Sequence, residues 1–365
     1  MQQVVLMGVG AWMQRHRPNW RVSVHIGSAA ELGRRLRDWR GAGALVAEQP
    51  TWRGDWLDRL PFPAVNTLGL VEEPRLPSVL GDDRAIGAAV AGHLLERGFR
   101  HICWVGGPTG GFSRRRAAGA EAVVTAAGGR WQEWSAVPVR LPAIREPMGF
   151  ACANDIIARR LLGSLQAAAV RVPETAAVVG INNDPLQCTL DALGLSSCDI
   201  NLQRRGWEAA ALLDRLMQGA PPPPAPVRLA PRGVVTRASS ETLAGADAVL
   251  IRTWSWLRAH ASDEDLRIAD LVAASGVSRR SLERRVQAQV GFGLQEALWR
   301  TRVAIAKGLL AESDQDLLGI ALDSGFRSAS AFATVFKRST GLSPRAWRRR
   351  WRCGAHAGEK ATAND

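Results

Sequence analysis

The sequence predicts two domains of different fold class. An α/β domain with a doubly wound sheet and two subdomains is expected over about residues 1–238, and an all-α domain over about residues 241–352. Up to about residue 240, short apolar runs alternate with helical patterns; beyond it only helical patterns occur, and one of them repeats. The stiff run Pro221–Pro224, which no helix interior tolerates, lies shortly before the change. A disordered tail is expected at residues 353–365.

In the first region, helices and strands are expected in alternation, which favours a parallel sheet. The expected helices are Val4–Arg15, Ala29–Arg40, Ala85–Arg97, Arg114–Ala127, Asp155–Ala169 and Leu202–Met217. The expected strands are Val22–Ile26, Ala44–Ala47, Ala64–Thr67, Ser78–Leu80, Ile102–Val105, Arg130–Ser135, Met148–Cys152, Ala177–Ile181, Val227–Leu229 and Val234–Thr236. Residues 119–149 have room for one helix and one strand, and hardly for a further helix.

In the second region, residues 268–291 predict a helix, a tight turn and a second helix. Gly276 suits the positive φ of such a turn, and Ser278 is a good N-cap for the helix that follows. Leu282 and Val286 recur at four-residue spacing and hold that helix down. The pattern is therefore a helix-turn-helix.

The same pattern returns about 50 residues later, at residues 317–341. Gly325 and Ser328 take the places of Gly276 and Ser278, and a long helix, roughly Leu294–Leu310, joins the two units. A lone helix-turn-helix pattern is a weak signal, because many helical hairpins resemble it. A tandem pair with basic second helices is far more specific for binding to double-stranded DNA.

Candidate base-contacting residues lie on the outward faces of the two second helices. In the first unit they are Arg279, Arg280, Glu283 and Arg284, since Arg can bind guanine bidentately and Glu can accept from cytosine. In the second unit they are Ser328, Ser330, Ala333, Thr334 and Lys337, mostly short and uncharged, which favours recognition of DNA shape. The alternative for the charged set is an ordinary solvated surface.

The composition limits the classes of function. The net charge of +13 favours an anionic partner. The arginines at the end of the second region are either phosphate contacts or a solvated helix end; they are Arg345, Arg348, Arg349, Arg350 and Arg352. Five scattered cysteines fit a reducing cytoplasm, and neither a signal peptide nor a membrane span is evident. No catalytic set, metal site or cofactor motif is found, so an enzyme is not expected.

The segment GFRSASAFATVFKRSTGLSPRAWR, residues 325–348, resembles the signature of the AraC family of transcription regulators. The resemblance covers about residues 253–351. It implies a seven-helix module that places two recognition helices in successive major-groove segments of a DNA operator. It also implies a homodimer, and RNA polymerase is a further candidate partner.

The first region resembles the LacI and periplasmic-sugar-binding fold, in DDRAIGAAVAGHLLERGFRHICWVGG and in FACANDIIARRLL. The resemblance implies a sugar site beyond the carboxyl ends of the strands. Arg116 matches the family's R-x-x-G motif, Asn154 and Asp155 follow a strand, and Asn182 stands where the family usually has a ligand-holding Asp. The alternative is that the Asn and Asp side chains cap the following helices. Trp12 or Trp104 is a candidate for a ring that faces the sugar.

Together the two resemblances are characteristic of XylR-type regulators, which respond to a xylose-like sugar. Besides Asn182, two departures from the family are visible: the strand that normally precedes the first helix of the sensor is missing, and the stretch Gly119–Gly149 is short. Two alternatives therefore stay open. One is a DNA-binding regulator with a degenerate sensor that binds no ligand, and the other is a sugar-binding protein or enzyme with a basic tail.

Overall fold

The structure is a computed structural model, and it describes residues 2–16, 19–52, 57–107, 110–190, 193–242, 248–313 and 315–352. The expected tail at residues 353–365, and the side chains of Arg349, Arg350 and Arg352, lie outside the described residues. The chain divides into two compact units. The first comprises residues 1–95 and 99–241, and the remainder forms the second.

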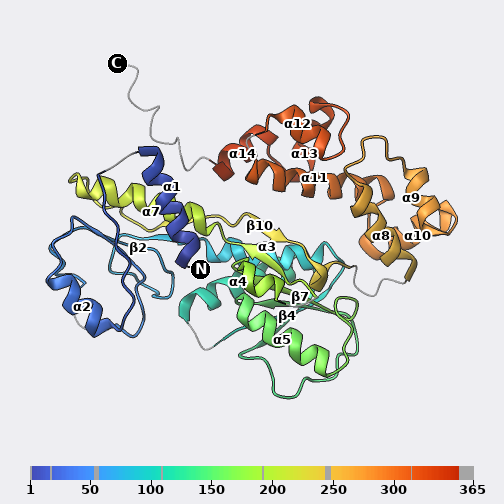
Figure 1. The fold of residues 1–365 in the computed structure, drawn as a ribbon. Helices are drawn as coiled ribbons and strands as arrows, with labels where there is room; N and C mark the ends of the chain where they lie inside the picture. Colours follow the sequence, from blue (N-terminus) through green and yellow to red (C-terminus); the bar gives the residue numbers. More distant parts are fainter. Residues whose placement is uncertain are drawn as a thin grey trace. The chain divides into compact units, whose positions relative to one another are not determined.

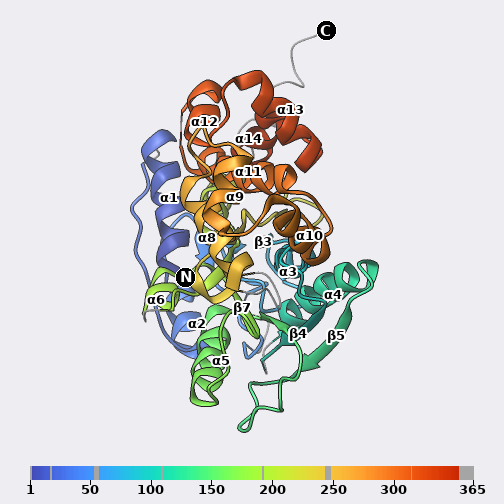
Figure 2. The same ribbon diagram turned by 90° about the vertical axis from the view of Figure 1, so that its right-hand side faces the viewer.

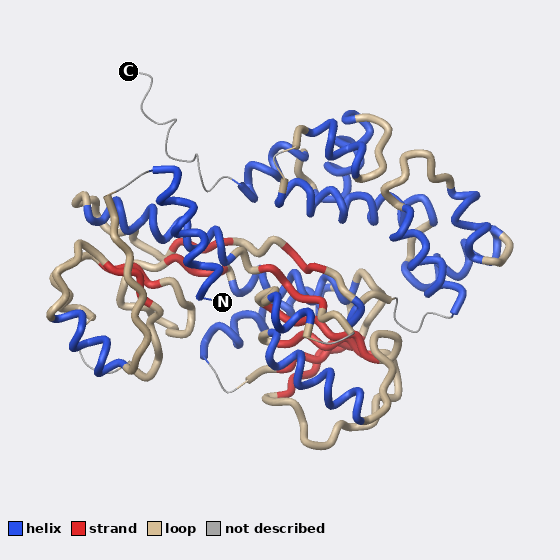
Figure 3. Tube along the Cα trace, viewed as in Figure 1, coloured by secondary structure: helices blue, strands red, loops and turns tan. Residues whose placement is uncertain are grey.

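Helices and strands alternate through the first unit (Figures 1 and 3). Its helices are α1 Gln2–His16, α2 Ala29–Arg37, α3 Asp83–Leu95, α4 Gly110–Ala126, α5 Asp155–Ala167, α6 Pro185–Thr189 and α7 Leu202–Met217, with a 3-10 helix η1 at Ala238–Ser240. Its strands are β1 Ala44–Val46, β2 Ala64–Asn66, β3 Val79–Gly81, β4 His101–Val105, β5 Arg130–Trp134, β6 Met148–Cys152, β7 Ala176–Ile181, β8 Ser196–Asp199, β9 Val227–Leu229 and β10 Gly233–Val235.

The largest sheet has six strands in the order β10-β8-β7-β6-β4-β5. Its pairs are parallel except for β10, which runs antiparallel to β8. Successive residues of a strand point to opposite faces of the sheet, and helices cover both of these faces. Phe150 packs in the same core cluster as Leu161 of α5, whereas Leu94 of α3 lies over the neighbouring Gly149. The predicted doubly wound arrangement is confirmed.

A smaller subdomain is built around α7, whose buried Ala209, Leu212 and Leu213 pack against Val65 of β2 and Val79 of β3. Here β1 pairs with β2 and β3 with β9, both in parallel. One isolated bridge links the ends of β2 and β3, and α1 packs along α7. The chain therefore crosses between the two subdomains more than once, and α7 begins at their junction.

The predicted strand at Val22–Ile26 is wrong. The segment is extended but pairs with no strand among the described residues, and Val22, Val24 and Ile26 are 53%, 60% and 87% exposed. Alternating apolar residues form a strand only where a neighbouring strand takes their backbone hydrogen bonds. The described chain begins with α1, and no described strand precedes it. Residues 119–149 hold the end of α4 and strand β5, and no helix is described between β5 and β6, as expected.

Seven helices form the described part of the second unit (Figure 2). They are α8 Ala248–His260, α9 Ile268–Ser275, α10 Arg279–Val290, α11 Leu294–Glu312, α12 Leu317–Asp323, α13 Ala329–Thr340 and α14 Pro344–Arg352. They bury two apolar clusters, one around Leu282 and Val286 of α10 and one around Phe332 and Phe336 of α13. Helix α11 contributes to both clusters and joins the two halves.

The predicted repeat is present in atomic detail. Helices α10 and α13 both have 12 residues and begin 50 positions apart. Ser278 and Ser328 cap them, each accepting a hydrogen bond from the backbone N–H three residues later. Gly291 and Gly341 end them with φ of 76° and 75°, a conformation that only glycine adopts without strain.

Candidate functional site

The solvent face of α10 is basic. Arg280 and Arg284 are exposed and make no ion pair with a described residue. Arg279 is also exposed, but its Nε donates to Glu283 Oε1 at 2.8 Å, so these two candidate base contacts bind each other in this structure. Gln287 continues the exposed stripe one turn further along the helix. The stripe carries guanidinium forks that match the acceptor edge of guanine.

The solvent face of α13 is shorter and less charged. Ser330, Thr334 and Lys337 are exposed and follow one helical stripe, as expected for groove-facing residues. Ser328 is exposed at the N-cap, where its Oγ accepts the Ala331 N–H. Ala333 is half-buried, whereas Ala331 is exposed. Ala333 thus lies at the edge of the apolar stripe, and its contact with the groove stays a prediction.

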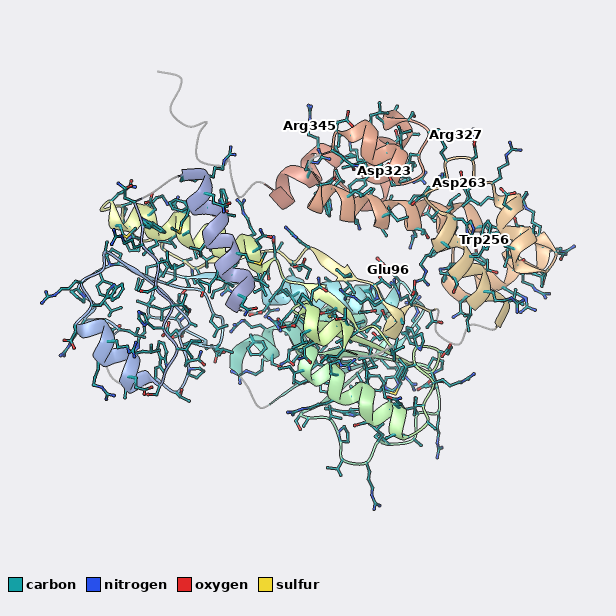
Figure 4. All side chains as sticks on the ribbon, in the orientation of Figure 1. Glu96, Trp256, Asp263, Asp323, Arg327 and Arg345 are labelled. Atoms are coloured by element: carbon teal, nitrogen blue, oxygen red, sulfur yellow. The ribbon has the colours of Figure 1, made fainter. Side chains whose placement is uncertain are left out.

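Arg302 of α11 anchors the loop after α8 to the long helix. Its side chain is 8% exposed; Nε donates to Ala261 O at 2.9 Å and Nη2 to Asp263 O at 2.7 Å. Arg327 lies in the same region as Asp263 (Figure 4). Its Nη2 pairs with Asp265 at 2.6 Å, and its Nε donates to Glu264 O. Both arginines bind residues of the loop between α8 and α9. Arg302 holds this loop to the joining helix α11, and Arg327, between α12 and α13, links it to the second helix-turn-helix.

Replacing Arg302 with Met should destabilise the second unit by about 1–3 kcal/mol, because two carbonyls would lose a charged donor. Thermal unfolding of the full chain, followed by circular dichroism, measures the effect. Arg300→Met is the matched control, since Arg300 on the same helix makes a half-exposed i,i−4 pair with Glu296 of the kind that contributes little. Equal stabilities of the two variants would contradict a structural role for Arg302.

A pocket lies in the first unit where strands of both subdomains end. It has about 480 Å³ of unfilled space, part of it open to solvent. The residues that line it are Leu68, Gly69, Leu70, Gly81, Asp83, Phe112, Arg116, Asn154, Asn182, Ile200 and Arg205. Three predicted ligand residues, Arg116, Asn154 and Asn182, therefore lie together, as expected for side chains that flank the carboxyl ends of strands.

Arg116 is held in place by helix packing and by Asp83. Gly119, the glycine of the R-A-A-G motif, lies against α3, where a Cβ would come within 2.1 Å of Arg84 O. This close approach brings Arg116 Nε to Asp83 Oδ1 at 3.0 Å and Nη1 to Ala153 O at 2.8 Å. The guanidinium also lies over the Phe112 ring, 4.7 Å from its centroid. Burial lowers the pKa of Arg116, and Asp83 counteracts that shift.

Asn154 and Asp155 have different positions although they are adjacent. Asn154 lines the pocket and caps α5, since its Oδ1 accepts the Ile157 N–H at 2.9 Å. Asp155 does not line the pocket: it is 1% exposed and accepts hydrogen bonds from Ser197 Oγ and from the Asp184 N–H. Burial raises the pKa of Asp155. The carboxylate therefore braces the ends of neighbouring strands, and the expectation that it contacts ligand is not supported.

The backbone after β7 is strained at two successive residues. Asn182 and Asn183 have φ of 122° and 51°, which non-glycine residues seldom adopt. Asn182 lines the pocket, and Asn183 Oδ1 accepts a hydrogen bond from Arg237 Nη2 at 2.8 Å. Strain of this kind is often kept at functional positions, where surrounding bonds hold the conformation.

Comparisons with known proteins agree with this geometry. Residues 91–240 match the family of periplasmic binding protein-like domains, and residues 271–350 match a helix-turn-helix domain family. The chain is 24% identical over 365 residues to the xylose operon regulatory protein of Escherichia coli (strain K12), covering 94% of this chain and 93% of that protein. A solved structure of the xylose-binding transcription activator xylR aligns with a TM-score of 0.58 and 22% identity, over 95% of this chain and 94% of that one.

The helical unit has a separate relative. Over 114 residues the chain is 34% identical to the HTH-type transcriptional activator RhaS of Klebsiella pneumoniae (strain 342), covering 31% of this chain and 41% of that protein. This chain belongs to the AraC family of transcription regulators, in the XylR-type arrangement. The regulator is thus a DNA-binding protein with a sensor domain of the sugar-binding type, and its relatives are regulators of transcription rather than enzymes.

Sequence reasoning missed one charged residue of the regulator's pocket. Arg205, one turn into α7, is 4% exposed and lines the pocket beside Asp83 and Arg116. No local motif marks it, because its position depends on where α7 begins between the subdomains. The expected aromatic contact was also misplaced: Trp12 packs against Trp20 and Trp104 is buried, whereas Phe112 supplies the ring. In the described part of the regulator no helix is long and apolar enough to span a bilayer.

Proposed function

We propose that the regulator binds a small sugar-like effector in the pocket of its α/β unit, and that the effector changes the affinity of the helical unit for its DNA operator. The observation that carries the proposal is the convergence of Arg116, Asn154 and Asn182 on one pocket. Guanidinium and amide groups pair well with hydroxyls, and the Phe112 ring offers an apolar face. The name of the relative in Escherichia coli makes xylose the first sugar to test.

A route from the pocket to the DNA-binding part is available within the first unit. Asn183 binds Arg237 through the bond already described, and Arg237 Nη1 also donates to Leu195 O at 2.9 Å. The next residues, Ser239 and Ser240, are buried; Ser239 Oγ donates to Val178 O, and Ser240 Oγ lies 2.8 Å from His93 Nε2. A shift at Asn182 would therefore reach the last residues of the unit, from which the chain continues to the helices. Ligand binding would act as a shift between populations of two arrangements.

Replacing Asn182 with Gly tests the ligand site. Glycine relieves the positive φ and removes the amide, so we expect sugar affinity to fall about tenfold, roughly the contribution of one or two hydrogen bonds. Calorimetry with a panel of aldoses, xylose first, measures the affinity. Gln166→Ala is the control, because Gln166 is exposed on α5 of the same unit and does not line the pocket. Unchanged affinity in Asn182→Gly would remove Asn182 from the site.

A second candidate function is a DNA-binding regulator whose sensor binds no ligand. The exposed, apolar segment at Val22–Ile26 favours it, since none of the described strands pairs with this segment. Operator binding that no sugar of the panel alters, and no heat of sugar binding, would establish this alternative. Homodimer formation and contact with RNA polymerase stay predictions from the family resemblance; sedimentation of the complex with operator DNA tests the first.

A further inference from the structure

The pocket has more positive than negative charge. Asp83 is the one acidic side chain among its lining residues, and it is already fully engaged. Its Oδ1 accepts from Arg116 Nε at 3.0 Å, and its Oδ2 accepts from Arg115 Nε and Nη2 at 3.0 Å and 2.8 Å. The other polar groups at the strand ends, Asn154 and Asn182, are amides and add no charge. The guanidinium groups of Arg115 and Arg116 thus already share the Asp83 carboxylate, and Arg205 adds a further positive charge to the pocket.

Arg205 has no acidic partner among the described residues. With described residues its guanidinium makes one hydrogen bond, a long one from Nη1 to Thr67 O at 3.4 Å, and its buried Nε has no partner among them. Burial lowers the pKa of Arg205 to about 10; the charge of Arg116 lowers it further and the charge of Asp83 counteracts part of the shift, so the side chain is still a cation at neutral pH. Gly81 keeps the space beside it open, since a Cβ there would come within 2.9 Å of Nη2.

A buried cation without a counter-charge is unfavourable, and proteins usually pair it. Acidic residues near these elements are engaged elsewhere. Asp199 lies 3.7 Å from Arg232, Glu72 pairs with Arg114 at the surface, and Asp82 accepts the Ala85 N–H at the start of α3. The missing counter-charge is therefore best supplied from outside the chain.

We propose that the effector is a small polyhydroxylated anion, a sugar that carries a carboxylate or a phosphate group, and that Arg205 binds its acidic group. This rests on the proposed function and names the chemical class of the ligand. Both groups match the planar fork of a guanidinium, which binds two oxygens at once. The hydroxyls would meet Asn154, Asn182 and Arg116, which line the same pocket.

The test is calorimetry on the full chain with matched ligands: xylose against xylonate, and glucose against gluconate and glucose 6-phosphate. Sodium phosphate and sodium sulfate are the bare anions. We expect at least one acidic sugar to bind about 10- to 100-fold more tightly than its neutral counterpart, as charged hydrogen bonds imply, and to weaken as salt is raised. The xylonate and gluconate arms identify a carboxylate ligand, and the glucose 6-phosphate arm a phosphate ligand.

Arg205→Met should bring the acidic-to-neutral affinity ratio close to one, while Arg205→Lys, which keeps the charge, should retain part of it. Arg215→Met is the control, because Arg215 is exposed on the same helix. The ratio is informative even if a variant is less stable, since both ligands are measured on the same protein.

Each other outcome overturns the inference. If a neutral sugar binds as tightly as its acidic form, the inference is wrong, but the proposed sugar response stands. Bare phosphate or sulfate that binds as tightly as the sugar acids leaves a simple anion site. An unchanged ratio in Arg205→Met removes Arg205 from recognition. If no ligand binds at all, the inference and the proposed sugar response fail together.

Discussion

Replacing both Arg280 and Arg284 with alanine is expected to weaken binding to the specific operator by about 2–6 kcal/mol. Each guanidinium is exposed on α10 and makes no ion pair with a described residue, so each is available to one base pair. A bidentate contact between Arg and guanine contributes about 1–3 kcal/mol of discrimination, and two such contacts to different base pairs set the expected range. The loss on random DNA should be much smaller.

Fluorescence anisotropy with labelled operator and random duplexes, each at several salt concentrations, separates base contacts from phosphate contacts. Arg252→Ala is the matched control, because Arg252 is exposed on α8, outside the recognition helices. Equal losses on both duplexes, with a shallower dependence on salt, would mean that Arg280 and Arg284 contact phosphate only. The single variants then show which base position each arginine determines.

The sequence predicted most of the fold because its signals are local. Helix α7 and strand β6 begin and end where their periodicity predicts, and the tandem helix-turn-helix follows from capping serines and turn glycines. The error at Val22–Ile26 has a different origin. Alternation shows that a segment suits a sheet, but whether a neighbouring strand is present depends on the rest of the chain. Strand formation is decided by long-range pairing that no local pattern contains.

In the candidate pocket, too, the sequence predicted the residues that lie beside a local signal. Arg116, Asn154 and Asn182 each adjoin a strand end or a motif, and strand ends meet at one edge of a parallel sheet. The bond from Arg116 to Asp83 joins residues 33 positions apart, and Arg205 reaches the pocket from a helix that begins after β8. No local sequence pattern marks either the bond between Arg116 and Asp83 or the position of Arg205 in the pocket. The charge balance of the pocket, and with it the class of effector, therefore emerges only in three dimensions.

Arg237→Met is expected to separate effector binding from DNA control. Arg237 links Asn183, which follows the pocket residue Asn182, to the end of the first unit. Arg237 Nη2 donates to Asn183 Oδ1, and the Arg237 backbone N–H donates to Ser196 Oγ, both at 2.8 Å. Met keeps the aliphatic stem and removes the polar contacts to Asn183 and to Leu195 O. The pocket and recognition helices stay intact, so effector affinity and DNA affinity without effector should change little. In coupled sites, one ligand changes the affinity for the other by a factor of typically about 5 to 150. In Arg237→Met this factor should fall toward one.

The measurement is a pair of titrations: DNA affinity with and without saturating effector, and effector affinity with and without operator DNA. Linkage requires the two ratios to be equal in each protein, which checks the data internally. Arg228→Met is the matched control, since Arg228 is an exposed arginine on β9 of the same unit, and it should keep the wild-type ratio. If Arg237→Met also keeps that ratio, the signal leaves the sensor by another route. A ratio near one with both separate affinities preserved would assign the coupling to the side-chain bonds of Arg237 to Asn183 and Leu195, because only the connection between the sites would have been lost.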